Sequence, residues 1–134
     1  NWSIAIENPF LEEAKGPLGR VQTNEAVSIF TSGNYRRFYR DRDNTLRHHI
    51  INPETGEPSL NISAVTVIHA DPTLTDIAAT TLMLTDTREL KQMAQKLGIE
   101  DFLAITEQHE LFISRSMMDK IEWLQPHGLK VKLL

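Results

Sequence analysis

Residues 63–84 read SAVTVIHADPTLTDIAATTLML, and this stretch predicts a strand followed closely by a helix. The first seven residues are rich in β-branched side chains, which is typical of a strand. Asp71 and Pro72 then have the pattern of a helix start, with Asp71 as the N-cap and Pro72 in the first helical position. We therefore predict a helix over residues 72–84. Four of its residues recur at helical spacing and share one face: Ile77, Thr80, Thr81 and Leu84.

Further elements are predicted on both sides of this unit. On the N-terminal side we expect strands over residues 2–6 and 26–31, and a hairpin whose arms are 35–40 and 46–51. On the C-terminal side we expect a helix over 88–97 closed by Gly98, a strand pair over 102–106 and 111–114, and an edge strand over 130–132. This order favours the α+β class, with an antiparallel sheet packed with two or three helices.

Composition bounds the class of protein. The chain has 134 residues, which is enough for one domain or for a fragment of a larger one, and its 40% apolar and 24% charged residues are ordinary for a globular protein. Cysteine is absent, so disulfides and thiolate metal sites are excluded. The net charge of −4 argues against nucleic-acid binding. One basic cluster is diluted by neighbouring aspartates and is interpreted as a solvated hairpin face: Arg36, Arg37, Arg40, Arg42 and Arg47.

The first candidate for chemistry lies in residues 48–56, which read HHIINPETG. His49 stands at the end of a predicted strand, directly before a rigid turn in which Pro53 fixes its own φ and Gly56 tolerates a positive φ. The near-neutral pKa typical of histidine suits a general acid or base. A surface histidine pair beside a β-turn explains the same pattern, and the residues alone leave both interpretations open.

The second candidate is the pair Asp76 and Thr80 on the predicted helix. Their i, i+4 spacing puts both side chains on one helical face, with Cβ atoms about 5–6 Å apart. Carboxylate and hydroxyl oxygens are ligands that suit Mg²⁺ when water and a substrate phosphate complete the site. Two structural alternatives stay open at this point. Asp76 could complement the helix dipole in the first turn, and the Thr80 hydroxyl could bond back to the chain.

Three ordered segments together resemble one known family. Residues 31–39 (TSGNYRRFY) resemble its T-S-G-[DN]-Y-x-x-[FY]-[FY] segment, and residues 49–58 (HIINPETGEP) resemble H-[IV]-[IL]-[DN]-P-x-T-G-x-P. Residues 64–67 followed by 75–82 resemble S-V-T-V followed by A-D-A-x-A-T-A-L. The opening WSIAIENP also resembles a strand of the same proteins. The family is that of the FAD:protein FMN transferases, called ApbE, and this chain is similar to its C-terminal portion.

The resemblance implies a specific activity and specific site residues. Members of the family transfer FMN from FAD to a Thr or Ser hydroxyl of a target protein, with Mg²⁺ as the cofactor and AMP as the product. By position in the motifs, His49 is implied as the catalytic base. His49, Ile50, Ser32 and Gly33 are implied as flavin-binding residues. Asp76 and Thr80 are implied as the metal ligands.

The resemblance also sets expectations about completeness and place. The family's D-x-G-[GA]-x-x-K-G motif and G-G-[DN] turn are absent from these 134 residues, so we expect weak or no catalysis by the chain alone. Two alternatives to the transferase are an FAD pyrophosphatase that gives FMN and AMP, and a non-catalytic domain with a binding or structural role. The implied partners are FAD and an acceptor flavoprotein subunit. The implied location is the bacterial periplasm, at the inner membrane and through a lipid anchor.

Overall fold

The computed structural model describes residues 1–10, 16–33, 38–40, 42, 46–48 and 62–134. The elements in chain order are β1 (Trp2–Ile6), β2 (Gly19–Thr23), β3 (Ser28–Gly33), β4 (Phe38–Arg40), β5 (Leu46–His48), β6 (Ile62–His69), α1 (Pro72–Met83), the 3₁₀ turn η1 (Thr87–Glu89), α2 (Leu90–Leu97), β7 (Asp101–Thr106), β8 (Glu110–Ile113), α3 (Arg115–Lys120), β9 (Ile121–Trp123) and β10 (Lys130–Leu133). Within these described ranges, no helix has the length and apolar character needed to cross a lipid bilayer.

The strands form three sheets. A five-stranded sheet has the order β10-β8-β7-β6-β3, and a three-stranded sheet has the order β1-β2-β9. All neighbours in both sheets are antiparallel except β10, which runs parallel to β8. The strands β4 and β5 pair antiparallel with each other, as the hairpin prediction requires. The predicted α+β class with an antiparallel sheet is therefore confirmed, and the parallel edge strand β10 is the exception.

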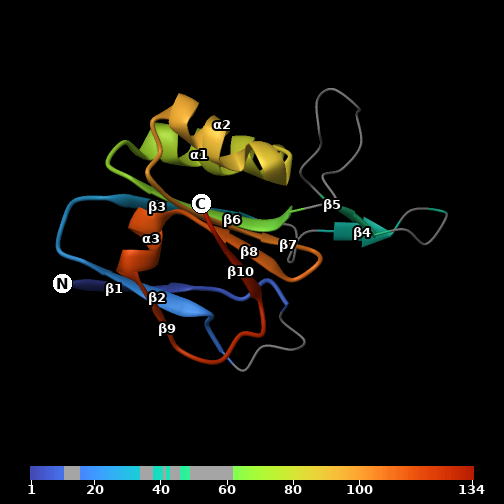
Figure 1. The fold of residues 1–134 in the computed structure, drawn as a ribbon, viewed down its shortest axis with the longest axis horizontal. Coiled ribbons are helices and arrows are strands. Elements are labelled where there is room, and N and C mark those ends of the chain that lie inside the picture. Colours follow the sequence, from blue (N-terminus) through green and yellow to red (C-terminus); the bar gives the residue numbers. More distant parts are fainter. Residues whose placement is uncertain (11–15, 34–37, 41, 43–45, 49–61) are drawn as a thin grey trace.

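The elements are stacked in layers around the five-stranded sheet (Figure 1). Helices α1 and α2 cover one face of this sheet, and the three-stranded sheet lies on the other side. The core on the helix side includes Val65 and Val67 of β6 together with Leu82 of α1. The core between the sheets includes Ile68 of β6 and Val21 of β2. Strand β6 is thus buried on both faces, which explains the run of apolar and β-branched residues from Ala64 to Ile68.

The helices agree with the predicted ranges to within a few residues. The helix predicted over 72–84 is α1, and the one predicted over 88–97 is formed by η1 and α2. Gly98 ends α2 with a φ of 73°, a left-handed conformation that glycine adopts without steric cost. Three short elements carry no strong periodic signal and were not assigned from the sequence: β2, α3 and β9.

Candidate functional site

The first turn of α1 is fixed by its N-cap. Asp71 has an extended conformation, and its Oδ1 accepts hydrogen bonds from the backbone N–H groups of Thr73 at 3.0 Å and Leu74 at 3.2 Å. Pro72 occupies the first turn, where its missing N–H costs nothing. The sequence prediction for this helix start is therefore confirmed. The cap sets where each later residue of α1 lies around the helix axis.

Helix α1 turns its small and apolar residues towards the five-stranded sheet. The residues of this buried face are Thr75, Ala78, Ala79, Leu82 and Met83. The face that carries Ile77 and Thr80 is the outward one, and Ile77 is 53% exposed. Asp76 is also exposed. The two candidate metal ligands are therefore accessible to solvent and to a ligand, and are not sealed in the core.

Thr80 faces the edge strand β3. The Oγ of Ser32 lies 3.4 Å from the Oγ1 of Thr80, and the pair is exposed. Ser32 is opposite Val65 in the sheet register, and Val65 belongs to the helix-side core, so the contact agrees with the alternation of side chains along β3. Gly33 is the last residue of the strand. The structure thus brings Ser32, Gly33 and Thr80 to one place on the surface, beside Asp76 one helical turn away.

The structure bears on the local alternatives for Asp76 and Thr80. The first turn of α1 contains no acidic residue, so Asp76 does not serve as a first-turn partner of the helix dipole. The bond back to the carbonyl four residues earlier is made by the neighbouring Thr81, whose Oγ1 donates to Ile77 O at 2.8 Å. The Thr80 hydroxyl contacts Ser32 across the helix–sheet boundary.

The other half of the predicted site lies outside the described residues. His49 and Ile50 belong to the range 49–61, and strand β5 ends at His48, directly before them. Their roles as base and flavin neighbour therefore stay predictions. Whether the His49 turn meets the Asp76 face at one pocket edge is likewise a prediction.

Asp76 and Thr80 fit Mg²⁺ in chemical type. Both offer oxygen ligands, and Mg²⁺ is commonly held by one or two protein oxygens together with water and substrate phosphates. Among the described residues, no three His, Cys, Asp or Glu side chains are grouped closely enough to enclose a metal ion.

A family model and several relatives match this chain. The model of the ApbE family matches residues 1–103. An FAD:protein FMN transferase of Rhodobacter capsulatus is 31% identical over 121 residues, which is 90% of this chain and 22% of that protein. One from Escherichia coli strain K12 is 30% identical over 112 residues, which is 83% of this chain and 31% of that protein. The chain therefore belongs to the ApbE family and spans about a third or less of these relatives.

Solved structures of the family share the fold. The flavin transferase ApbE from Vibrio cholerae has a TM-score of 0.70 and 27% sequence identity, covering 89% of this chain and 37% of that one. The ApbE protein from Thermotoga maritima has a TM-score of 0.76 at 24% identity, covering 89% of this chain and 38% of that one, and at this identity shows the fold alone. The mixed architecture of strands and helices described above is therefore that of ApbE proteins.

Proposed function

We propose that this chain carries part of the site of an FAD:protein FMN transferase. The observation that supports the proposal is the contact between Ser32 and Thr80. These residues are 48 positions apart and come from two different motifs, yet their hydroxyl oxygens lie 3.4 Å apart on an exposed surface. When two sequence motifs bind the same ligand, they are expected to lie side by side in the folded protein even if they are far apart in the sequence.

In the proposed reaction, a Thr or Ser hydroxyl of an acceptor protein attacks the phosphorus of the FMN half of FAD. The new bond joins the acceptor oxygen to this phosphorus, the diphosphate P–O bond breaks, and AMP leaves. His49 takes the proton of the acceptor hydroxyl, which makes it the general base. Ser32, Gly33 and Ile50 border the flavin nucleotide and orient it.

Asp76 and Thr80 are the residues that would hold Mg²⁺. A Mg²⁺ ion supplies charge neutralisation for the diphosphate, which is the largest electrostatic demand of phosphoryl transfer. Asp76 would contribute one negative charge and Thr80 a neutral oxygen. The pair would therefore neutralise only part of the charge of the ion, and the phosphates of FAD would supply the rest. The proposal extends to a periplasmic, membrane-anchored protein, for which family resemblance is the support and cell fractionation is the test.

The metal part of the proposal can be tested without catalysis. Mn²⁺ substitutes for Mg²⁺ at oxygen sites and broadens the NMR signals of nearby amides. In the presence of FAD, Mn²⁺ should broaden the amide signals of residues 76–80 before others. Asp76→Asn should weaken this effect about tenfold, while Asp86→Asn, an exposed carboxylate after the end of α1, should leave it unchanged. If Mn²⁺ broadens these signals equally in Asp76→Asn and Asp86→Asn, Asp76 is not a metal ligand.

The transfer itself is tested with an acceptor. The protein is incubated with FAD, Mg²⁺ and an acceptor that has a Thr-containing flavinylation segment, and covalent flavin on the acceptor is measured together with AMP. Flavin on the acceptor supports the transferase. If free FMN and AMP form and the acceptor carries no flavin, the activity is that of an FAD pyrophosphatase and not of a transferase. If the protein that contains this chain forms neither product, an enzymatic role is contradicted.

A further inference from the structure

A cavity lies beside β3 and β6 at the opposite end of these strands from the Ser32–Thr80 contact. It has a volume of about 470 Å³, within the range of small-molecule pockets. It is lined by residues of β2, the β2–β3 connection, the end of β6, the α2–β7 connection, the start of β7 and the end of α3. In the sheet register, His69 of this cavity is opposite Ser28, at the other end of β3 from Gly33. The cavity is therefore separate from the Ser32–Thr80 surface.

Asp101 is the buried polar group of this cavity. The residue is only 9% exposed, and its Oδ2 accepts a hydrogen bond from Lys120 Nζ at 2.5 Å. Its Oδ1 is enclosed and has no hydrogen-bond partner within the described part of the chain. A carboxylate oxygen can accept two hydrogen bonds, and leaving one buried without a donor is costly. Because Oδ1 is enclosed, a donor in the cavity would take the place of Lys120 at Oδ2.

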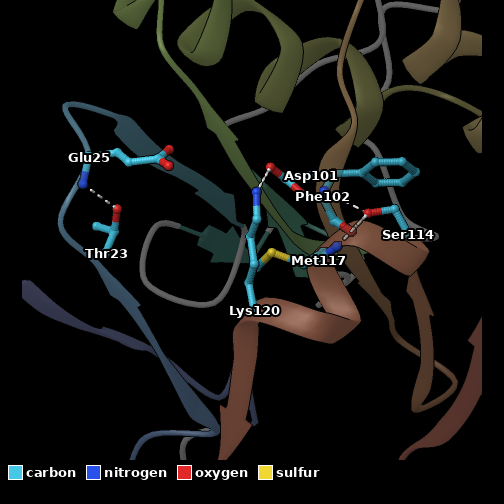
Figure 2. Close-up of polar contacts among 7 residues, drawn as sticks. All are labelled: Thr23, Glu25, Asp101, Phe102, Ser114, Met117 and Lys120. Atoms are coloured by element: carbon cyan, nitrogen blue, oxygen red, sulfur yellow. Dashed lines mark hydrogen bonds and ion pairs between the residues drawn. The ribbon is translucent and has the colours of Figure 1, made fainter.

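The charge around Asp101 favours a cation. Three carboxylates line the cavity, those of Glu25, Glu100 and Asp101, against the single ammonium of Lys120. Figure 2 shows the Glu25 side chain extending from the β2–β3 connection towards the Asp101–Lys120 pair. The turn that carries Glu25 is fixed by a hydrogen bond from its backbone N–H to Thr23 Oγ1 at 3.1 Å. A hollow with an excess of one charge concentrates the opposite charge.

The cavity is better suited to an organic cation than to a metal ion. The described residues contain no group of three His, Cys, Asp or Glu side chains that could enclose a metal. The cavity also has an apolar wall formed by Val21, Val27 and Ile68, which a metal ion would not use. An alkyl stem can pack against such a wall while its charged end reaches the carboxylates.

We propose that this cavity binds an alkylammonium or alkylguanidinium group. The cationic head lies between Glu25 and Asp101, and the stem lies on the apolar wall. Lys120, whose side chain is 46% exposed, then turns out towards solvent. The cationic head then takes the place of the Lys120 ammonium at Asp101 Oδ2. Such a group occurs both in free polyamine-like molecules and in Lys or Arg side chains of proteins.

The test is a titration of the protein with agmatine, followed by amide NMR shifts. Agmatine should shift the signals of Thr23, Asn24 and Gly98, and the effect should weaken as salt is added. The uncharged 1,4-butanediol should leave them unchanged. A blocked Gly-Arg-Gly peptide is the second arm: tighter binding of the peptide identifies a protein side chain as the source, and tighter binding of agmatine identifies a free amine.

Two variants with opposite expectations make the test decisive. Glu25→Gln should weaken agmatine binding about fivefold, with Glu89→Gln as its exposed, distant control. Lys120→Met should tighten binding severalfold because it removes the competing ammonium, with Lys91→Met as its control. If Lys120→Met does not fold, Glu25→Gln still decides. Equal affinities of Glu25→Gln and Glu89→Gln, or weaker binding by folded Lys120→Met, would overturn the proposal.

Discussion

Ser32 and Thr80 meet where the edge strand β3 passes under helix α1, with their hydroxyl oxygens 3.4 Å apart. Neither residue is buried, so the contact is weak as a source of stability. The contact is informative about position, because it shows that the outward face of α1 lies beside the C-terminal end of β3. Any ligand that touches Thr80 is therefore within reach of Ser32 and Gly33.

The Thr80 hydroxyl is expected to matter for metal binding and not for folding. Thr80→Val keeps the shape of the side chain and removes its oxygen, so the affinity for Mn²⁺ in the presence of FAD should fall about tenfold. Thr80→Ser keeps the oxygen and should retain most of the affinity. Amide broadening by Mn²⁺ measures both. A Thr80→Val protein that binds Mn²⁺ as tightly as the unmodified chain would contradict the assigned role.

The orientation of α1 predicts unequal costs for two truncations on the same helix. Leu82 is fully buried in the helix-side core, so Leu82→Ala should lower the free energy of unfolding by about 2–5 kcal/mol. Ile77 is 53% exposed, so Ile77→Ala should cost less than about 1 kcal/mol. Denaturant titration of both variants is the measurement. Similar losses in the two variants would mean that the helix is rotated from the described position.

The N-cap of α1 predicts a graded series at one position. Asp71→Ala removes the acceptor for two backbone N–H groups and should destabilise the protein by about 1 kcal/mol. Asp71→Ser and Asp71→Asn keep an acceptor and should cost a fraction of that. Thermal unfolding compares the three variants. A loss in Asp71→Ser as large as that in Asp71→Ala would show that the cap is not the source of the stability.

The ion pair between β8 and β10 predicts a pH dependence. Lys132 Nζ lies 2.7 Å from Glu110 Oε2, and this hydrogen bond is the main reason that the pKa of Glu110 lies below its ordinary value. Because the pKa of Glu110 is lower in the folded state, the ionised carboxylate stabilises the fold at pH values above its unfolded-state pKa of about 4.3. This contribution is lost as the pH falls through the folded-state pKa.

The difference in Tm between the unmodified protein and Glu110→Gln should therefore be largest at neutral pH and should decrease as the pH is lowered. Lys132→Met removes the donor and should flatten the same dependence. Unfolding curves collected from neutral pH down through the acid range measure both effects. A difference in Tm that stays constant, or grows, as the pH falls would rule out this ion pair as its cause.

The sequence predicted those parts of the fold whose signals are local. The β-branched run of β6, the Asp71 cap and the Gly98 stop each act through their own chain neighbours, and all three were found where expected. The short elements α3 and β9 have too few residues for a period to be visible. The parallel pairing of β10 with β8 depends on a contact between separate segments, which no local pattern encodes.

The sequence names candidate site residues but does not give their geometry. Asp76 and Thr80 share a face because of their spacing alone, and the structure shows that both residues are exposed. The approach of Ser32 to Thr80 follows from the packing of α1 on β3, which spacing cannot give. Helical spacing likewise grouped Ile77 with Thr80 without telling which face the sheet would cover.

Strand β10, at the edge of the five-stranded sheet, bears on whether copies of the protein can pair through their strands. Strand β10 forms one margin of the five-stranded sheet, and its exposed residues alternate between lysines and apolar side chains: Lys130, Val131, Lys132 and Leu133. Among the described strands β10 has a neighbour on one side only, and such an edge is a template on which another strand can add. Lysine side chains on a sheet edge disfavour such strand addition, and of the two on β10 Lys132 is already paired with Glu110, which leaves Lys130 as the residue whose charge would face an incoming strand.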